Sequence, residues 1–265
     1  LTPIEASLTI EFDRAFHIGT GRAEGPVNRT VRRTANGRPY VPASALKGTL
    51  RETAERIVRR IDERAKTLEE PPEKFLGAQR RGDQAISEPC QAPRPQDMCQ
   101  SRSPCVLCRL FGNTLTGRRL IVDDARPVDS PLLAASPEDD MKRQTKSGEV
   151  ETYTRVRVDR RRKGAQGNAL FTSENARPTR LASRLSGQLP LTSIEDHPPA
   201  ELILLASTLA ATDQIGGGAS AGRGRCRITV EEDRIRLGRS DDAQHYTLQT
   251  LVESFEPFAN SLLFQ

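Results

Sequence analysis

The sequence predicts an α+β fold in which strands and helices alternate along the chain. An alternating apolar segment near the N-terminus indicates a half-buried strand, and two longer apolar patterns indicate helices. The predicted strands and helices, in chain order, are Ala6–Phe12, Ser44–Lys66, Arg119–Asp124, Arg180–Leu191, Pro199–Thr212 and Cys226–Val230. This order of strand, helix, strand, strand, helix and strand is that of a ferredoxin-like core, here interrupted by long insertions.

The first strand shows the clearest alternation. Leu8, Ile10 and Phe12 share one face, and Thr9 and Glu11 share the other. Successive side chains of a strand point to opposite sides, so this pattern predicts a strand with one side in the core and one side in water.

A rigid entry leads into the first helix. Pro39 and Pro42 hold the chain extended, because the residue before a proline is pushed out of the α region. Ser44 then occupies the position expected of an N-cap, and the helix is expected to end at about Lys66. Its apolar face consists of residues at helical spacing, namely Leu46, Leu50, Ala54, Ile57, Val58 and Ile61.

Two cations near the start of this helix indicate an anion site. Lys47 lies in the first turn, where a cation opposes the helix dipole and Asp or Glu would be more stabilising. Lys47 and Arg51 are four residues apart and therefore share a face. A helix N-terminus that carries both side chains suits a phosphate group, and a solvated basic face is the alternative interpretation.

The composition favours a polyanionic partner. The 265 residues carry a formal net charge of +5, and the sequence pI is about 9.1. Aromatic residues make up only 4% of the chain and Trp is absent, so we expect a nucleic acid to be held mainly through its phosphates and sugars. The sequence shows no apolar run of about 18 residues and no signal peptide, which predicts a cytoplasmic protein without membrane contact.

The segment 67–108 predicts a zinc-binding insertion. Its part Thr67–Pro104 is poor in apolar residues, rich in proline and charge, and too long for an ordinary connection. Four cysteines lie in or next to it, with the pattern Cys90-x8-Cys99-x5-Cys105-x2-Cys108. The last pair has the spacing of a zinc knuckle, and four thiolates would close a tetrahedral shell whose metal supplies folding energy. Free thiols, or a His that completes the site, are the alternatives.

Three further segments concentrate arginine. The polar stretch Asn28–Arg38 contains Arg29, Arg32 and Arg33. The basic stretch Thr152–Glu174, which includes Arg160, carries turn signals that predict a projecting hairpin. A solvated basic hairpin without a ligand is the alternative.

The third segment, Ile215–Arg225 with the sequence IGGGASAGRGR, combines Arg223 and Arg225 with five glycines. Glycine permits close approach of the backbone, and exposed amides next to guanidinium groups suit a phosphate backbone. A flexible turn is the alternative. The segment matches neither a Walker loop nor a dinucleotide-binding loop, because no Gly-Lys-Ser/Thr follows and because it precedes a strand.

The sequence offers few candidate catalytic residues. Of the three histidines, only His17 lies beside a glycine-rich loop, residues 17–25 with the sequence HIGTGRAEG. We favour a hydrogen bond within the loop or a phosphate contact for His17 over a role as general base. Glu24 and Asp13 are the carboxylates near this loop.

Five motifs together resemble the RAMP superfamily of CRISPR-associated RNA-binding proteins, and among them the backbone subunit of type III effector complexes. The motifs occur in the family's order and touch most of residues 8–230; they are FHIGTG, YVPASALKGTLR, CVLCRLFGN, VRVDRRRKGAQGNALFTSE and IGGGASAGRGR. The resemblance implies an RRM-like core whose subunits stack along a guide RNA and position target RNA in antiviral defence. The implied partners are CRISPR guide RNA, single-stranded target RNA, and other subunits of the complex, including copies of this chain or related subunits.

The resemblance also assigns roles to residues of this sequence. Lys47 and Arg51 would contact the guide backbone, and Arg223 and Arg225 would help to cover it. The hairpin around Arg160 would be the thumb that interrupts the guide–target duplex. The RNA-binding residues expected from the resemblance and from the patterns above are His17, Arg29, Arg32, Arg33, Ser44, Lys47, Arg51, Arg160, Arg223 and Arg225.

The expected organisation is discontinuous. The core would comprise residues 1–66 and 109–235, the zinc-binding insertion residues 67–108, and the thumb hairpin residues 152–174. Residues 236–265 would form a C-terminal extension that closes on Leu-Phe-Gln, a sequence that resembles the remnant of a protease site.

Some backbone subunits of this family also cut target RNA, using a loop aspartate with a divalent metal such as Mg or Mn. Their motif is an Asp followed by a small residue, Pro and a branched apolar residue, and the matching run here is Glu24-Gly25-Pro26-Val27. The glutamate is one methylene longer, which matters because in-line attack depends on close placement. Three hypotheses follow: a guide-RNA-binding subunit, a metal-dependent endoribonuclease centred on Glu24, and a non-catalytic adaptor whose zinc insertion docks a protein partner.

Overall fold

The computed structural model describes most of the chain outside the insertions. The described residues are 1–65, 67, 79–81, 84–86, 99, 104–113, 117–128, 149–159, 161–191, 198–239 and 243–263. Cys90 and Arg160, which carry two of the sequence predictions, lie outside them.

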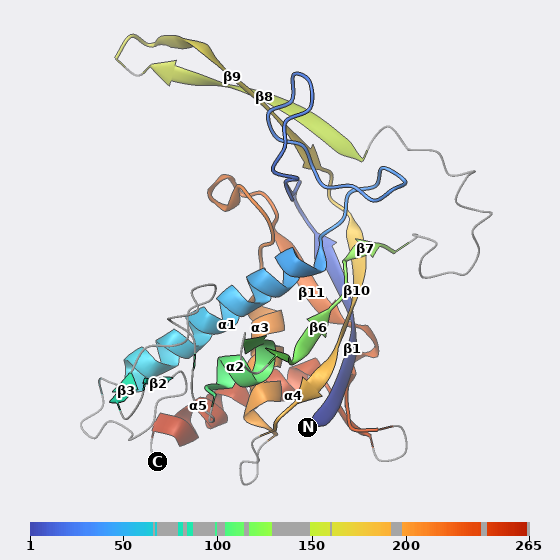
Figure 1. Cartoon of the computed structure of the whole chain (residues 1–265), viewed down its shortest axis with the longest axis vertical. Coiled ribbons are helices and arrows are strands. Elements are labelled where there is room, and N and C mark those ends of the chain that lie inside the picture. Colours follow the sequence, from blue (N-terminus) through green and yellow to red (C-terminus); the bar gives the residue numbers. More distant parts are fainter. Residues whose placement is uncertain are drawn as a thin grey trace, which may run out of the picture.

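An antiparallel sheet forms the centre of the molecule (Figure 1). Its long strand β1 pairs with β10 on one side and with β11 and β12 on the other, while β10 also pairs with β6 and β7. The strands of this sheet are β1 (Thr2–Phe12), β6 (Leu120–Val122), β7 (Arg126–Pro127), β10 (Arg180–Leu189), β11 (Cys226–Val230), β12 (Ile235–Leu237) and β13 (Gln244–Tyr246). Together with the helices, this sheet confirms the predicted α+β class.

The alternation predicted for the first strand is confirmed. Leu8, Ile10 and Phe12 are buried, whereas Thr9 is half-buried and Glu11 is exposed on the opposite face. The helices cover the buried face of the sheet (Figure 1). They are α1 (Ala43–Ala65), α2 (Val106–Phe111), α3 (Ala200–Ala211), α4 (Leu248–Glu253) and α5 (Phe255–Leu263).

The long helix α1 has the predicted apolar face and ends at Ala65, next to the predicted end. Its positions Leu46, Leu50, Ala54 and Val58 are fully buried against the sheet and α3. Burying each leucine contributes on the order of 2 kcal/mol relative to leaving it exposed. The apolar stripe therefore fixes which side of α1 faces the core.

The predicted N-cap of α1 is wrong. The helix begins at Ala43, so Ser44 is its second residue and is exposed. The amide of Ala43 donates a 2.9 Å hydrogen bond to Oδ1 of Asp124, whose other oxygen accepts one from Arg126 at 3.1 Å. The carboxylate of Asp124, which follows β6, thus caps an amide at the start of α1 that has no partner within the helix. Ser44 was expected to provide this cap.

The second main helix, α3, matches its prediction and carries a buried charge. Glu201 is fully buried, and its Oε1 accepts a 2.6 Å hydrogen bond from Nε of Arg109 in α2. A buried carboxylate requires such a partner, because an unpaired one would be strongly destabilising. This ion pair fixes α2 against α3.

Two strand predictions need correction. Ile121 in β6 is 45% exposed, so the segment predicted as a buried strand is buried on one face only. The strand Cys226–Val230 does not close the sheet, because β12 and β13 continue it and α4 and α5 pack against α3. Part of the expected C-terminal extension thus belongs to the core. Within the described residues, no helix combines the length and apolar character that a membrane crossing requires.

A two-stranded ribbon projects from the sheet (Figure 1). It consists of β8 (Val150–Asp159) and β9 (Gly164–Ala176), which pair with each other and include the predicted hairpin. The remaining short elements are β2 (Gln79–Arg81), β3 (Gln84–Ile86), β4 (Gly112–Asn113), β5 (Gly117–Arg118) and two 3-10 turns, Ala219–Ala221 and Glu231–Asp233. Every described residue from Thr152 to Val158 and from Arg161 to Ala165 is exposed, so the outer part of the ribbon stands free of the described core.

Candidate nucleic-acid interface

Three predicted segments meet at the base of the β8–β9 hairpin: the loop after β1, the glycine-rich segment before β11, and the inner end of β9. Phe16 and Ala176 exchange backbone hydrogen bonds of 3.0 and 2.8 Å. The amide of Gly217 donates a hydrogen bond to the carbonyl of His17, and the amide of Gly224 donates one to the carbonyl of Ala15, both at 2.9 Å. Segments that are far apart in the sequence therefore form one surface.

His17 lies buried beneath the surface where these segments meet. It is 9% exposed, and its Nδ1 lies 2.7 Å from the carbonyl oxygen of Glu174. Because a carbonyl only accepts, Nδ1 of His17 carries the proton in this contact. The hydrogen bond of His17 thus goes to β9 and not to its own loop, and the contact of His17 with RNA stays a prediction.

The glycines of the segment 215–225 are required by packing. Gly216 has a φ of +98°, and a Cβ there would lie 2.7 Å from the carbonyl oxygen of His17. Gly224 has a φ of +73°, and its Cβ would lie 2.1 Å from the carbonyl oxygen of Ile215. The side-chain amide of Gln214 closes the loop with a 2.6 Å hydrogen bond to the carbonyl of Arg223. The close approach expected of these glycines is observed, and a merely flexible turn does not explain it.

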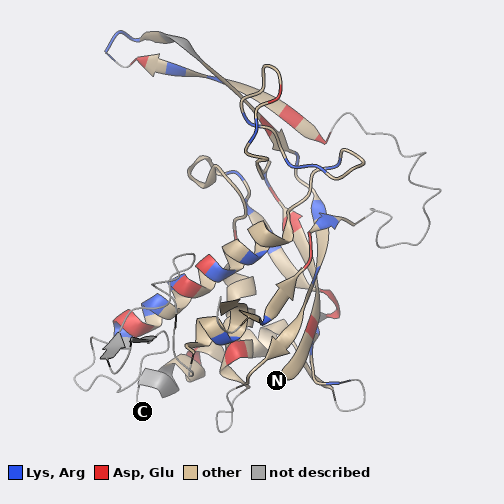
Figure 2. Cartoon of the chain, in the orientation of Figure 1, with Lys and Arg blue, Asp and Glu red and all other residues tan. Residues whose placement is uncertain are grey.

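Arginines of the first loop lie along the other edge of β9. The guanidinium of Arg29 is 5.2 Å from the ring centroid of Phe171. Arg33 pairs with Glu174 at 2.8 Å, and the other oxygen of that carboxylate accepts a 3.0 Å hydrogen bond from the amide of Val31. Arg32 is exposed. Figure 2 shows basic residues along this loop and at the tip of the hairpin.

Arg223 reaches from the glycine segment to the hairpin. Its guanidinium lies 5.5 Å from the ring centroid of Tyr153. Burial, and then the nearby charge of Arg155, lower the pKa of Arg223, and Tyr153 partly offsets this effect. Arg225, two residues further along the chain, is exposed. Two guanidinium groups held close enough to repel each other favour an anionic ligand between them.

The register of the hairpin places these aromatic and basic side chains on one face. Tyr153 is opposite Ser173, and Arg155 is opposite Phe171, so all four side chains share a side of the ribbon. Tyr153 and Phe171 are 39% and 38% exposed. We call Arg29, Tyr153, Arg155, Phe171 and Arg223 the hairpin-base cluster. Sequence reasoning missed its two aromatic residues. The signal that would have found Tyr153 is the run Thr152-Tyr153-Thr154-Arg155, in which Tyr and Arg alternate with Thr.

The cations of α1 lie elsewhere and have partners within the chain. Nζ of Lys47 donates a 2.5 Å hydrogen bond to the carbonyl of Leu120 in β6. Arg51 bonds Glu55 through Nε and the carbonyl of Gly112 through Nη1, both at 3.0 Å, and its side chain is 13% exposed. The structure thus directs these two residues toward β4–β6 rather than toward the hairpin-base cluster.

Glu24 lies at the exposed tip of the first loop. It exchanges two 3.0 Å backbone hydrogen bonds with Val27, which close the turn. Among the described residues, the clusters of three or more Cys, His, Asp or Glu side chains that could hold a metal do not include Glu24. Its catalytic role stays a prediction.

Three of the four predicted cysteine ligands form a cluster that could hold a metal ion. The Sγ atoms of Cys99, Cys105 and Cys108 all lie within 4.8 Å of one another, and all three residues are buried. Cys105 is the N-cap residue of α2, and its amide lies 3.4 Å from Sγ of Cys99. Cys226 is a separate buried thiol, as predicted, and burial raises its pKa to about 12. Three convergent buried sulfurs are a donor set suited to a soft or borderline metal.

The close contact of Gly216 with His17 gives a testable prediction for the glycine-rich segment. We expect Gly216→Ala to lower the free energy of unfolding by about 1–3 kcal/mol more than Gly222→Ala, because only the first adds an overlap with a carbonyl oxygen. Gly222 is the matched control: it has a φ of +71°, and its Cβ would meet nothing within 4 Å. Urea denaturation of both variants measures the difference. Equal losses of stability would show that Gly216 does not pack tightly against His17.

The sequence and the fold of this chain were each compared with known proteins. The family model described as "RAMPs: RAMP superfamily" matches residues 9–227. A chain of the structure titled "Cryo-EM structure of the Type III-B Cmr-beta bound to cognate target RNA" is similar in fold, with a TM-score of 0.51 and 13% sequence identity. That match covers 86% of this chain and 98% of the other. A comparison with curated proteins gave no match. Since the family model spans most of the chain, the protein belongs to the RAMP superfamily.

Proposed function

We propose that this chain is an RNA-binding backbone subunit of a type III CRISPR effector complex, which holds a guide RNA and positions target RNA along it. The observation that carries the proposal is the hairpin-base cluster, where three arginines and two exposed aromatic rings converge from three segments of the chain. Membership of the RAMP superfamily and a fold like that of a chain in a target-bound Cmr-beta structure support it.

The chemistry of the cluster suits single-stranded RNA. Guanidinium groups neutralise phosphates and release counterions, which gives sequence-independent affinity. Exposed aromatic rings offer stacking surfaces to bases of any identity, as a subunit that accepts any guide requires. The low aromatic content of the sequence suggested a grip through phosphates and sugars alone. The positions of Tyr153 and Phe171 favour a mixed grip.

The core supports an RRM-like and ferredoxin-like assignment. The strands β11, β1, β10 and β6 lie in that order and are all antiparallel, with α1 and α3 on one face. We also propose that Lys47 and Arg51 contact the guide backbone, although both side chains have partners within the chain.

Replacing the arginines of the cluster should weaken RNA binding in a salt-dependent way. We expect the change of Arg29, Arg155 and Arg223 to Ala to reduce the slope of log K against log salt by about 2, because each phosphate that is no longer neutralised on a single strand reduces it by about 0.7. Filter binding or fluorescence anisotropy with single-stranded RNA of several sequences measures both affinity and slope. The decrease in affinity should be similar for all sequences.

A matched control for this test lies on α1. Arg59, Arg60 and Arg64 are exposed there, so the triple change to Ala removes the same charge from another surface. If the control variant decreases affinity and slope as much as the cluster variant does, the cluster is not the RNA site.

Replacing the aromatic residues should have a different signature. We expect Tyr153→Ala with Phe171→Ala to lower affinity by about 1–3 kcal/mol for each stacked base while the salt slope stays unchanged, because stacking releases no counterions. The same titrations measure this result. A change in slope without a decrease in affinity would contradict a stacking role.

Cleavage of target RNA at Glu24 is a second candidate function. The observation in its favour is position: Glu24 is exposed on the loop whose residues Asn28 and Arg29 donate backbone hydrogen bonds to Thr172 in β9. In the assembled complex, with Mg or Mn present, we expect Glu24→Ala to abolish target cleavage and to leave RNA affinity unchanged. Gel analysis of labelled target RNA measures this outcome, and intact RNA with the unmodified chain would reject the candidate.

We also propose a structural zinc ion at Cys99, Cys105 and Cys108, with Cys90 as the predicted fourth ligand. Zinc would cross-link the insertion to α2, because thiolates from separate segments would bind the same ion. We expect Cys108→Ser to lose zinc and to lower the Tm by about 5 °C or more, because each 1 kcal/mol shifts the Tm of such a chain by about 2–4 °C. Elemental analysis and thermal melts measure both effects. Cys226→Ser, which removes a buried thiol outside the cluster, should retain the metal, and a metal-free unmodified chain would refute the proposal.

A further inference from the structure

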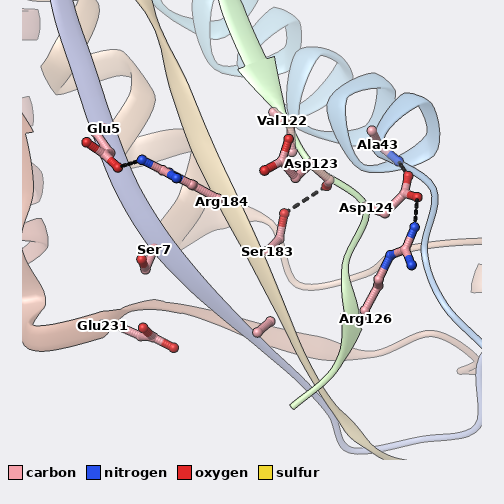
Figure 3. A pocket seen from close by; sticks show the side chains of 11 residues that line it. Glu5, Ser7, Ala43, Val122, Asp123, Asp124, Arg126, Ser183, Arg184 and Glu231 are labelled. Atoms are coloured by element: carbon pink, nitrogen blue, oxygen red, sulfur yellow. Dashed lines mark hydrogen bonds and ion pairs between the residues drawn. The ribbon is translucent and has the colours of Figure 1, made fainter. Parts of the chain in front are cut away.

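The face of the sheet opposite the helices carries a groove. Its volume is about 990 Å³, and its lining comes from β1, β10, the segment after β6 and the turn after β11. The lining includes four carboxylates, Glu5, Asp123, Asp124 and Glu231, and two arginines, Arg126 and Arg184 (Figure 3). The groove is therefore net acidic within a chain whose formal net charge is +5.

Both arginines of the lining already have carboxylate partners. Arg184 is paired with Glu5, which also pairs with Arg236, and Arg126 is paired with Asp124 at 3.1 Å. A phosphate group would have to compete with these carboxylates for the same guanidinium groups. The groove therefore disfavours RNA, in contrast to the hairpin-base cluster.

Two carboxylates of the lining remain uncompensated. Asp123 and Glu231 are both exposed, and Figure 3 shows both among the side chains that line the groove. Within the described part of the chain, no cation is paired with either carboxylate, and Oε1 of Glu231 accepts a 3.3 Å hydrogen bond from the hydroxyl of Thr9. Two such negative charges attract cationic groups of a partner.

The strand register places these two carboxylates in one row across the sheet. Glu231 directly follows β11 and comes level with Ser7 of β1, one residue beyond the last pair of these strands. Ser7 is opposite Arg184 of β10, and the carbonyl of Arg184 accepts a 2.9 Å hydrogen bond from the amide of Asp123. Neighbouring strands are about 4.8 Å apart, so three steps separate the backbones of Glu231 and Asp123 by about 14 Å.

This separation fits an extended segment that crosses the strands. Residues i and i+4 of an extended chain are about 13 Å apart and point to the same side. In an α-helix, a separation of about 14 Å corresponds to nine residues, and residues nine apart lie on opposite faces. Two cations of one extended segment can therefore reach both carboxylates, whereas two cations of one helix cannot.

An exposed apolar residue lies beside the row. Ile121 of β6 is 45% exposed and is opposite Ser186 of β10, which is in turn opposite Glu5 of β1. The three residues form the neighbouring row on the same face of the sheet. Lysine and arginine carry long aliphatic stems that pack on apolar surface while the charged head stays in water. The groove thus offers contacts to the stem and to the head of a basic side chain.

We propose that the groove binds an extended basic segment of a different protein. The segment crosses β1 and β10 and has Lys or Arg at positions i and i+4, one facing Glu231 and the other facing Asp123. The charge of the groove and the spacing of its two uncompensated carboxylates carry this assignment. The groove shares no residue with the hairpin-base cluster, so the proposal does not depend on RNA binding.

A titration of the full chain with two isomeric peptides, after ribonuclease digestion, tests the spacing. The first blocked peptide, Gly-Arg-Ser-Gly-Ser-Arg-Gly, has its arginines four residues apart, and the second, Gly-Ser-Arg-Gly-Arg-Ser-Gly, has them two residues apart. Amide chemical shifts in NMR spectra locate the site and give the dissociation constants. We expect the first peptide to shift groove amides and to bind about two- to fivefold more tightly, because it forms one more exposed ion pair. Added salt should weaken binding.

Reversing the charges of the groove and of the peptide tests the contact directly. Asp123→Lys with Glu231→Lys should weaken binding of the first peptide by about tenfold or more. The same variant should bind the blocked peptide Gly-Glu-Ser-Gly-Ser-Glu-Gly, which also shows that the variant is folded. The matched control on α1, Glu52→Lys with Glu63→Lys, changes two exposed residues by the same charge and should bind the arginine peptide as the unmodified chain does.

Several outcomes would overturn the proposal. Equal affinity for the two isomers, or shifts outside the groove, would reduce the effect to general attraction between charges. A charge-reversed variant that does not bind the acidic peptide would exclude direct contact. Groove shifts caused by single-stranded RNA alone would assign the groove to RNA, and groove shifts that grow with the concentration of the chain alone would assign it to a second copy. Loss of RNA binding in the hairpin-base variants would change none of these results.

Discussion

The pairing of β1 with β10 is the constraint on which the rest of the structure depends. The antiparallel register runs from Thr2 opposite Leu189 to Glu11 opposite Arg180. It places the loop that leaves β1 next to the hairpin that enters β10, and the amide of Phe12 bonds the carbonyl of Thr179 at 2.9 Å. The basic loop and the base of the hairpin therefore meet because their strands pair, although they are well separated in the sequence.

The same pairing separates two kinds of surface. Apolar residues alternate toward α1 and α3, and polar residues alternate toward the open face of the sheet. Most arginines of the open face have carboxylate partners there, as in the bridge from Arg184 through Glu5 to Arg236. At the base of the hairpin, by contrast, burial and then the nearby charge of Arg155 lower the pKa of Arg223. Arginines with carboxylate partners thus lie on the open face of the sheet, whereas arginines that repel each other lie at the base of the hairpin.

Local patterns made the elements predictable, while tertiary contacts decided the details. Periodicity predicted β1, α1 and α3, because apolar spacing reflects the face that is buried. The cap of α1 was not predictable, since Asp124 comes from a segment about eighty residues later. Arg51 shares a helix face with Lys47 as expected, but the carbonyl of Gly112 holds it inward. The ring of Tyr153 meets Arg223 only through the fold, so the aromatic part of the site was missed.

Helix α2 links the cysteine cluster to the centre of the molecule. Cys105 precedes its first residue, Cys108 lies in its first turn, and Arg109 follows directly with its bond to the fully buried Glu201. Oxidation of the thiols would shift the first turn and pull the guanidinium away from that carboxylate, leaving a buried negative charge without compensation. The redox state of the three sulfurs would then change the electrostatic environment of Glu201 in α3, which is buried in the core.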